Sequence, residues 1–123
     1  MKEVVIVSAC RTAIGKFLGS LKNVPAKTLA ITVGKAAVAR AGISADIIDE
    51  IVMGEVYPHM QGSLPARQVG LAVGLPVRSN ACNVNQNCAS GMRALDIACT
   101  NIMAGKTDIA LVVGVENMSA TPY

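Results

Sequence analysis

The sequence predicts an α/β fold in which a mostly parallel sheet is covered by helices on both faces. Apolar runs at residues 3–9, 50–56 and 109–115 do not alternate with polar residues, which is typical of strands buried on both faces. Longer segments with helix start and stop signals separate these runs, as parallel strands joined by crossover helices require. No internal repeat, low-complexity tract or linker divides the 123 residues, so a single domain is expected.

The first strand is expected at residues 3–9, buried, and a loop with two glycines follows at 11–21. Pro25 is expected to open a helix that runs to about Arg40, and Gly42 to end it. Proline suits the first helical turn, and glycine suits the left-handed position after the last turn. The apolar residues near one face of this helix are Leu29, Val33, Ala36, Ala37 and Ala41.

The next unit consists of a turn, a strand and a helix. Ser44 is expected to cap a short turn at 45–48, and the second strand follows at 50–56. A loop at 57–64 leads to a helix at 65–73, which begins with a proline. The residues expected to close that helix are Gly74 and Pro76.

The last unit contains the most polar stretch of the chain. Residues 77–87 are expected to be extended and residues 89–103 helical, with Gly105 stopping the helix before a third strand at 109–115. The apolar residues on one side of this helix are Met92, Leu95, Cys99, Ile102 and Met103. No closing helix follows that strand, so we expect a truncated sheet with an uncovered edge.

The composition argues against a nucleic-acid partner. Hydrophobic residues make up 52% and charged residues 15%, a globular composition and not a disordered one. With two Tyr, one Phe and no Trp, the chain lacks the aromatic platforms on which single-stranded nucleic acids stack. The net charge of +3 comes from scattered Lys and Arg, which is too weak and dispersed for a nucleic-acid surface.

The expected compartment is the cytoplasm. The longest apolar runs are much too short to span a membrane, and the N-terminus enters a strand pattern without the features of a signal peptide. The four cysteines include no Cys-x-x-Cys pair, so they are expected to be reduced thiols. Together with a single histidine they offer no metal-ligand spacing, and no metal site is expected.

Cys88 is the candidate catalytic residue. An extended polar stretch at 83–87 runs into it, and small residues and a helical pattern follow. Partial positive charge and free N–H groups in the first turn of a helix favour a thiolate and can hold a developing oxyanion. The alternative is a buried cysteine acting as a small hydrophobe. The neighbours of Cys88 do not favour this alternative, because polar or small residues do not pack a core. They are Asn85, Gln86, Asn87, Ser90 and Gly91.

The other candidate residues have weaker support. Cys10 and Cys99 lie in apolar surroundings and are expected in the core. Six extended residues put Cys82 roughly 20 Å from Cys88, too far for a disulfide. His59, the only imidazole, is either a general base or a solvated loop residue. The cations that are either anion contacts or surface charges are Arg11, Lys16, Arg67 and Arg93.

Four segments, in order and with matching spacing, are similar to those of a known enzyme family. They are residues 7–21, Pro65-Ala66-Arg67-Gln68, residues 84–95 around Cys88, and residues 114–119 with Pro122-Tyr123. On these segments the chain resembles the N-terminal part of the thiolases, in particular the acetyl-CoA C-acetyltransferase type. The resemblance covers essentially all 123 residues. The chain departs from many relatives at Gln86, where they carry a basic residue, and at Val113, where they carry a second glycine.

The resemblance implies a thiolase-like layered fold, of which residues 1–123 would form one truncated domain in the N-terminal half. It implies that Cys88 accepts an acyl group in the Claisen condensation of two acetyl-CoA to acetoacetyl-CoA, or in the reverse thiolysis, with its own N–H in the oxyanion hole. Coenzyme A is then a co-substrate, and no permanently bound cofactor is implied. The histidine and second cysteine that assist Cys88 in the family lie on downstream Gly-His-Pro and Cys-x-Gly-Gly motifs, which are absent here.

The resemblance also implies a homodimer or homotetramer in which Ala81 to Gln86 lie near a two-fold contact. Two alternatives stay open. One is a longer-chain 3-ketoacyl-CoA thiolase, because the pocket that decides chain length lies mostly outside these residues. The other is a non-catalytic thiolase-like module that binds an acyl group or lipid, or only dimerises. The downstream histidine and cysteine motifs would discriminate between enzyme and module.

Overall fold

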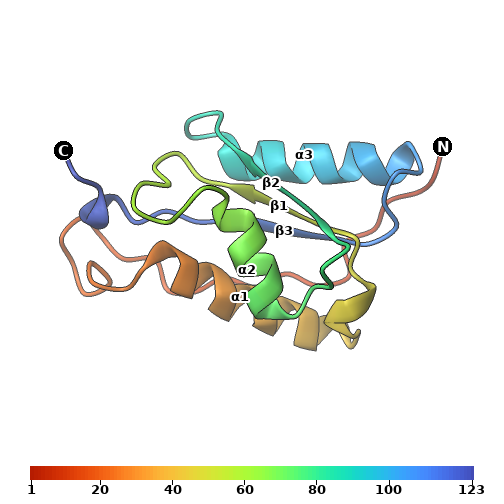
Figure 1. The fold of residues 1–123 in the computed structure, drawn as a ribbon, viewed down its shortest axis with the longest axis horizontal. Helices are drawn as coiled ribbons and strands as arrows, with labels where there is room; N and C mark the ends of the chain where they lie inside the picture. The colour runs from red at the N-terminus through yellow and green to blue at the C-terminus, as the bar shows by residue number, and fades with distance from the viewer.

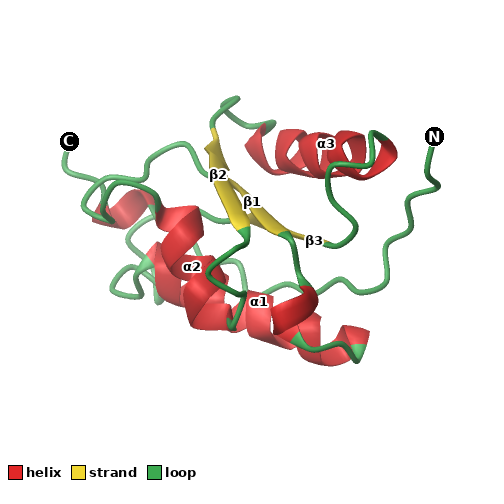
Figure 2. Ribbon diagram, turned by 45° about the vertical axis from the view of Figure 1, so that its right-hand side comes forward, coloured by secondary structure: helices red, strands yellow, loops and turns green.

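The computed structural model describes all 123 residues and has three layers, with a parallel sheet in the middle (Figure 1). The strands are β1 (Glu50–Gly54), β2 (Asn80–Val84) and β3 (Ala110–Gly114), in the order β2-β1-β3. The helices are α1 (Ala26–Ala41), α2 (Pro65–Val73) and α3 (Ser90–Met103). Figure 2 shows α1 and α2 on one face of the sheet and α3 on the other, so the predicted fold class is confirmed.

The central strand β1 holds the core together. All five of its residues are buried, and Glu50 pairs in parallel register with residues of both neighbouring strands. Ile51 and Met53 belong to the cluster under α1 and α2, whereas Val52 packs with Ala94 and Ala98 of α3. Because both faces are covered, every position of β1 is buried and the strand has no polar alternation.

The proline and glycine signals place the helix ends correctly. Helix α1 follows Pro25 and ends before Gly42, which has φ 68°. Helix α2 begins at Pro65 and is followed by Gly74, with φ 114°. The prediction that Ser44 caps the next turn is wrong, since its side chain makes no cap hydrogen bond. The Ser44 backbone carbonyl accepts from the Ile47 N–H instead.

Residues 3–9 do not form the buried strand that the sequence predicts. This segment pairs with no strand, and Val5, Ile6 and Val7 are 68%, 70% and 69% exposed. A strand needs the N–H and C=O groups of a neighbour, and no strand of this chain lies in hydrogen-bonding position beside the segment. The apolar sequence is therefore present without the partner that would bury it.

The helix faces that contact the sheet are made of small residues. The buried positions are Ala26, Ala30 and Gly34 on α1, and Ser90, Ala94 and Ala98 on α3. The larger apolar residues expected on the core side, such as Leu29 and Leu95, are only partly buried. Small residues let both helices lie close to the sheet, and the larger side chains are directed elsewhere.

Candidate active site

Cys88 lies in the connection between β2 and α3 and is exposed to solvent. Ala89 is the N-cap residue of α3, so Cys88 precedes the cap instead of standing in the first turn. Asn87, directly before it, has φ 49°, a left-handed conformation that is uncommon outside glycine. Asparagine adopts this conformation more readily than other non-glycine residues, so the residue type suits the turn.

Ser90 fixes the turn that carries Cys88. Its hydroxyl donates to the Asn87 carbonyl at 2.6 Å and accepts from the Gln86 N–H at 2.9 Å. Two backbone bonds of 3.1 Å support the same turn, from Ala89 N to Gln86 O and from Ser90 N to Asn87 O. Ser90 is 5% exposed, so this clamp is shielded from water and holds the exposed thiol on a defined backbone.

Several backbone donors around Cys88 have no partner within the chain. The first helical hydrogen bond runs from Arg93 N to Ala89 O, and the N–H groups of Cys88, Gly91 and Met92 bond to no carbonyl or side chain. Unpaired donors at a helix N-terminus carry partial positive charge. They are suited to stabilise negative charge on a thiolate or on the oxygen of a reacting carbonyl.

Three glycines bring the start of α3 against the sheet. Gly54 and Gly114 are paired in register at the ends of β1 and β3. A Cβ on Gly54 would lie 2.5 Å from the carbonyl carbon and oxygen of Ser90, and a Cβ on Gly114 would lie 3.5 Å from the Gly91 Cα. The sequence analysis noted Gly91 only as a small neighbour and missed the other two. The sequence signal for this close contact was a glycine at the end of each of two apolar strands, since glycine in a strand often marks the close approach of another backbone.

A buried acid stands beside this contact. Glu55 follows β1, is 2% exposed, and accepts a hydrogen bond from Gln61 Nε2 at 2.5 Å through Oε1. Its second oxygen has no partner. Burial raises the pKa of the Glu55 carboxyl, the Gln61 bond opposes that rise, and the negative charge of Glu116 adds to it.

Glu116 ties the ends of two strands together. Its carboxylate accepts from Val56 N at 2.8 Å and from Tyr57 N at 3.1 Å. The loop after β1 is thereby fixed to the segment after β3. Sequence reasoning singled out neither Glu55 nor Glu116, although an acidic residue close behind a buried apolar strand was a usable signal.

The structure does not bring the other sequence candidates to Cys88. His59 is exposed and stacks on Tyr57, with ring centroids 6.1 Å apart. Arg67 donates to the carbonyls of Val77 and Ser79 and so has a structural role. Of the remaining three cations, Arg11 and Lys16 line a cavity beside β3, and Arg93 pairs with Asp96.

Cys88 is also distinguished from the other three thiols by its exposure. Cys10, Cys82 and Cys99 are partly buried, and all four cysteines are free. Burial raises the pKa of the Cys82 thiol, and the nearby Glu50 charge adds to the rise. Nowhere do three or more His, Cys, Asp or Glu side chains converge as metal ligands would, and none of the helices has the length and apolar character needed to cross a membrane.

Comparison with known proteins relates this arrangement to one family. The family model described as "Thiolase, N-terminal domain" matches residues 4–123. The acetyl-CoA acetyltransferase of Cupriavidus necator is 46% identical over 123 residues, which are 100% of this chain and 31% of that protein. The mitochondrial acetyl-CoA acetyltransferase of Bos taurus is 43% identical over the same length, 29% of its own.

Solved structures agree with this relationship. The acetyl-CoA acetyltransferase of Syntrophomonas wolfei superimposes with a TM-score of 0.94 and 57% identity, over 97% of this chain and 30% of that one. The Acat5 thiolase of Ascaris suum, solved in complex with coenzyme A, gives a TM-score of 0.96 at 34% identity, over 98% of this chain and 32% of its own. The chain thus spans about a third of the length of the proteins that it matches.

Proposed function

This chain belongs to the thiolase family, and we propose that residues 1–123 are one partial domain of a longer thiolase that transfers acyl groups through Cys88. The observation that carries the proposal is the exposed Cys88 on the clamped turn before α3. It is supported by similarity over the whole chain to acetyl-CoA acetyltransferases. The reaction proposed for the longer protein is the condensation of two acetyl-CoA to acetoacetyl-CoA, and its reverse.

The chemistry proceeds in two balanced steps. The Cys88 thiolate attacks the thioester carbon of acetyl-CoA, and coenzyme A leaves as a thiol after taking up a proton, so the acetyl group is bound to sulfur. The α-carbon of a second acetyl-CoA, after losing a proton, attacks that carbonyl and releases Cys88 as acetoacetyl-CoA forms. In this proposal the N–H of Cys88, which has no partner within the chain, holds the negative oxygen of each tetrahedral intermediate.

Coenzyme A is a co-substrate in this proposal, and the scheme uses no permanently bound cofactor. The Ascaris relative solved with coenzyme A supports this assignment. The proton transfers need a base and an acid within reach of sulfur and carbon. Since His59 stacks on Tyr57, we assign those roles to residues of the longer protein.

We further propose that the longer protein is a homodimer or homotetramer with Ala81 to Gln86 near a two-fold contact. Support comes from the position of β2 at an edge of the sheet, with one side unpaired. Its residues Ala81 to Val84 are only partly buried. An unpaired edge strand is a natural surface for pairing with a second copy.

The experiment uses the longer protein with Cys88→Ser and, as a matched control, Cys99→Ser. Radiolabelled acetyl-CoA should acylate the parent and the Cys99 variant at Cys88, as shown by peptide mapping, and leave the Cys88 variant unlabelled. Turnover should nearly disappear in the Cys88 variant only, since an alcohol is a far weaker nucleophile than a thiolate. Undiminished turnover without Cys88 would remove this residue from the mechanism.

A further inference from the structure

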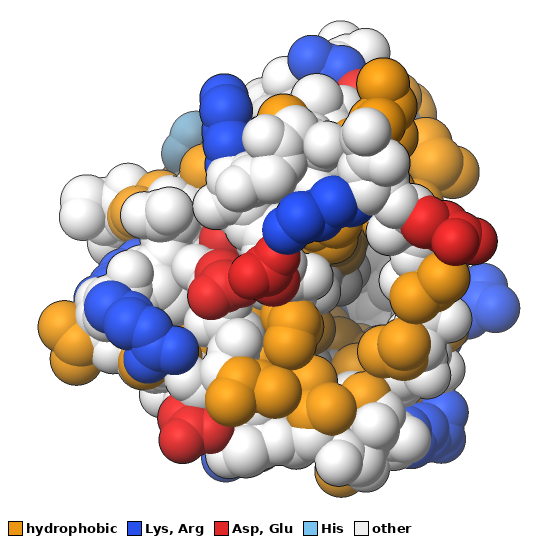
Figure 3. Space-filling view, turned by 90° about the vertical axis from the view of Figure 1, so that its right-hand side faces the viewer, with side chains coloured by type: hydrophobic (Ala, Val, Ile, Leu, Met, Phe, Trp, Pro, Cys, Tyr) orange, Lys and Arg blue, Asp and Glu red, His pale blue; other side chains and the backbone are white.

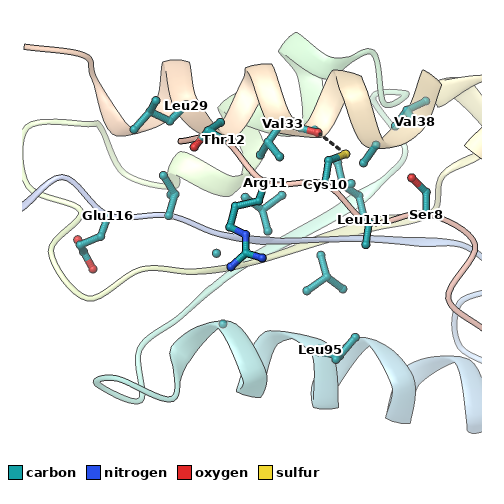
Figure 4. Close-up of a pocket in the computed structure, with 18 of the residues that line it drawn as sticks. Ser8, Cys10, Arg11, Thr12, Leu29, Val33, Val38, Leu95, Leu111 and Glu116 are labelled. Carbon is teal, nitrogen blue, oxygen red and sulfur yellow. Dashed lines mark hydrogen bonds between the residues drawn. The ribbon is translucent and has the colours of Figure 1, made fainter. Parts of the chain in front are cut away.

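Most of the buried polar atoms that have no hydrogen-bond partner within the chain lie at one end of the sheet. The four atoms are Ser8 Oγ, Glu55 Oε2, Gln61 Oε1 and Asn83 Nδ2. Ser8 lines the apolar cavity beside β3, where hydrophobic side chains surround a deep hollow (Figure 3). Figure 4 shows Ser8 near one end of this cavity and Glu116 near the other. The remaining three atoms lie on the Glu116 side, since Glu116 accepts from the N–H of Val56, directly after Glu55.

The strand register brings these three atoms together. Asn83 of β2 is paired with Met53 of β1, and Glu55 follows Met53 by two residues, so Glu55 and Asn83 share the face of the sheet that α1 and α2 cover. The Glu55 N–H donates to the Val84 carbonyl at 3.0 Å, which keeps the two strands side by side at this point. Gln61 joins them through its hydrogen bond to the Glu55 carboxylate.

Hydrogen bonds within the chain determine which atom of each side chain is left without a partner. The Ala66 N–H can only donate, and it donates to Asn83 Oδ1 at 2.9 Å, so the remaining atom of that amide is the donor Nδ2. Glu55 Oε1 accepts from Gln61 Nε2 at 2.5 Å, so the remaining atoms of this pair are two oxygens. An ionised carboxylate and an amide oxygen only accept. The site therefore offers two acceptors and one donor.

Gln61 is held in place from outside the site. Its backbone carbonyl accepts from Lys27 Nζ at 3.1 Å and from Gln68 Nε2 at 2.8 Å. Lys27 Nζ also donates to Gln68 Oε1 at 2.6 Å. Helices α1 and α2 thus both anchor the loop that carries Gln61. Because this anchoring keeps the Gln61 amide next to Glu55, its buried oxygen needs a partner at the site itself.

The pattern of acceptors and donor selects water over the other possible occupants. A water molecule donates two hydrogen bonds and accepts a third, and three bonds are typical of buried water. A metal ion or an ammonium group suits the two oxygens but is repelled by the Asn83 Nδ2 hydrogens. A proton shared between Glu55 and Gln61 would leave Asn83 Nδ2 buried and unpaired, which is unfavourable. Glu55 is 2% exposed, so the occupant must be small enough to be enclosed by this chain.

We propose that one buried water molecule is bound between Glu55, Gln61 and Asn83, where it donates to Glu55 Oε2 and Gln61 Oε1 and accepts from Asn83 Nδ2. The water joins the loop after β1 to the strand that leads into the Cys88 turn. This site goes beyond the proposed acyl transfer and does not depend on it, so its test needs no measurement of activity.

A crystal structure of the longer protein, at a resolution that shows ordered water, tests the site directly. Density for a single water is expected about 2.7–3.2 Å from each of the three atoms. Four results would overturn the proposal. They are a site without density, direct contact between Glu55 Oε2 and Gln61 Oε1 that excludes water, a cation held by both oxygens with the Asn83 amide turned away, and a side chain from elsewhere in the protein seated at the site.

Paired variants of the longer protein supply a second readout. Glu55 and Asn83 exchange no direct hydrogen bond, so a shared water predicts that the effects of Glu55→Met and Asn83→Ala do not add. The shift in the thermal unfolding midpoint of the double variant should differ from the sum of the single shifts by about 2 °C or more.

Asn101→Ala is the matched control for Asn83→Ala. Asn101 belongs to α3 on the other face of the sheet and donates to the Glu50 carboxylate, so its shift should add to that of Glu55→Met. Additive shifts for both pairs would contradict a water shared by Glu55 and Asn83. If a variant does not fold, the crystal structure of the unmodified protein still decides between the occupants.

Discussion

Among single residues, Cys88 combines an exposed thiol with unpaired backbone donors. Cys10, Cys82 and Cys99 are partly buried, and burial holds the pKa of Cys82 above its usual range. Limiting iodoacetamide near neutral pH should therefore alkylate Cys88 first, because exposure and thiolate character control reactivity. Adducts mapped by mass spectrometry give the order directly. First labelling of Cys10 or Cys99 would count against Cys88 as the nucleophile.

The carboxyl of Glu55 gives a pH dependence with a defined sign. Burial raises its folded-state pKa above the ordinary value of 4.5, so the folded state binds the proton more tightly than the unfolded state. The contribution of this carboxyl to the free energy of unfolding is fully present at pH values below its unfolded-state pKa. That contribution is lost as the pH rises through its folded-state pKa. Glu55→Gln should therefore raise the free energy of unfolding at neutral pH, with a smaller gain in acid.

Urea unfolding at a series of pH values measures that effect. Glu3→Gln is the control, since Glu3 is exposed and surface substitutions usually change stability little. A Glu55→Gln gain that stays constant across the pH range would show that the carboxyl does not titrate differently on folding. A lower free energy of unfolding for Glu55→Gln at neutral pH would show that the charged carboxylate stabilises the fold.

At the scale of elements, the contact between β1 and α3 depends on Gly54. A Cβ there would lie 2.5 Å from Ser90 backbone atoms, so Gly54→Ala should destabilise the chain by about 1–3 kcal/mol, as overpacking does. Gly91→Ala is the matched control, because its Cβ would lie 3.9 Å from the nearest atom, the Gly114 Cα. Chemical denaturation measures both. Equal stability of the two variants would refute the close-contact argument.

Elements with local signals could be predicted from the sequence, and contacts between elements could not. Pro65 and Gly74 delimit α2 as expected, because their backbone preferences act without tertiary help. Cys88 was found from its local motif. An acidic residue close behind a buried strand marks Glu55 and Glu116 in the sequence, but the hydrogen bonds that define the role of Glu116 arise only when the ends of β1 and β3 lie side by side.

At the scale of the whole molecule, the strand predicted at residues 3–9 does not form because it too depends on contacts between elements. Their apolar pattern is that of an interior strand, but a strand is stable only when a neighbour pairs with it. In this chain the space beside them is the cavity at β3. The sequence pattern thus matches a paired, buried strand, whereas the structure leaves residues 3–9 unpaired and Val5, Ile6 and Val7 exposed.

The edge of β2 tests the proposed assembly. Asn80 N and Val84 O bond toward β1, so the N–H of Ala81 points outward. Ala81→Pro should leave the sheet folded, since proline is tolerated on a free edge, and should shift the longer protein from dimer or tetramer to monomer. Light scattering measures the mass. An unchanged mass would place the two-fold contact elsewhere.

The last prediction is that the 123-residue chain alone does not catalyse thiolysis. An ordinary cysteine thiol has a pKa of about 8.5, so only a few per cent is ionised at neutral pH without a nearby base. His59 is the only imidazole in the chain, and it stacks on Tyr57 instead of contacting Cys88. An assay with acetoacetyl-CoA and coenzyme A on the purified chain, with His59→Ala as the control, measures this. Robust turnover that vanishes in the His59 variant would show a self-sufficient catalyst and would overturn the assignment of the base to the longer protein.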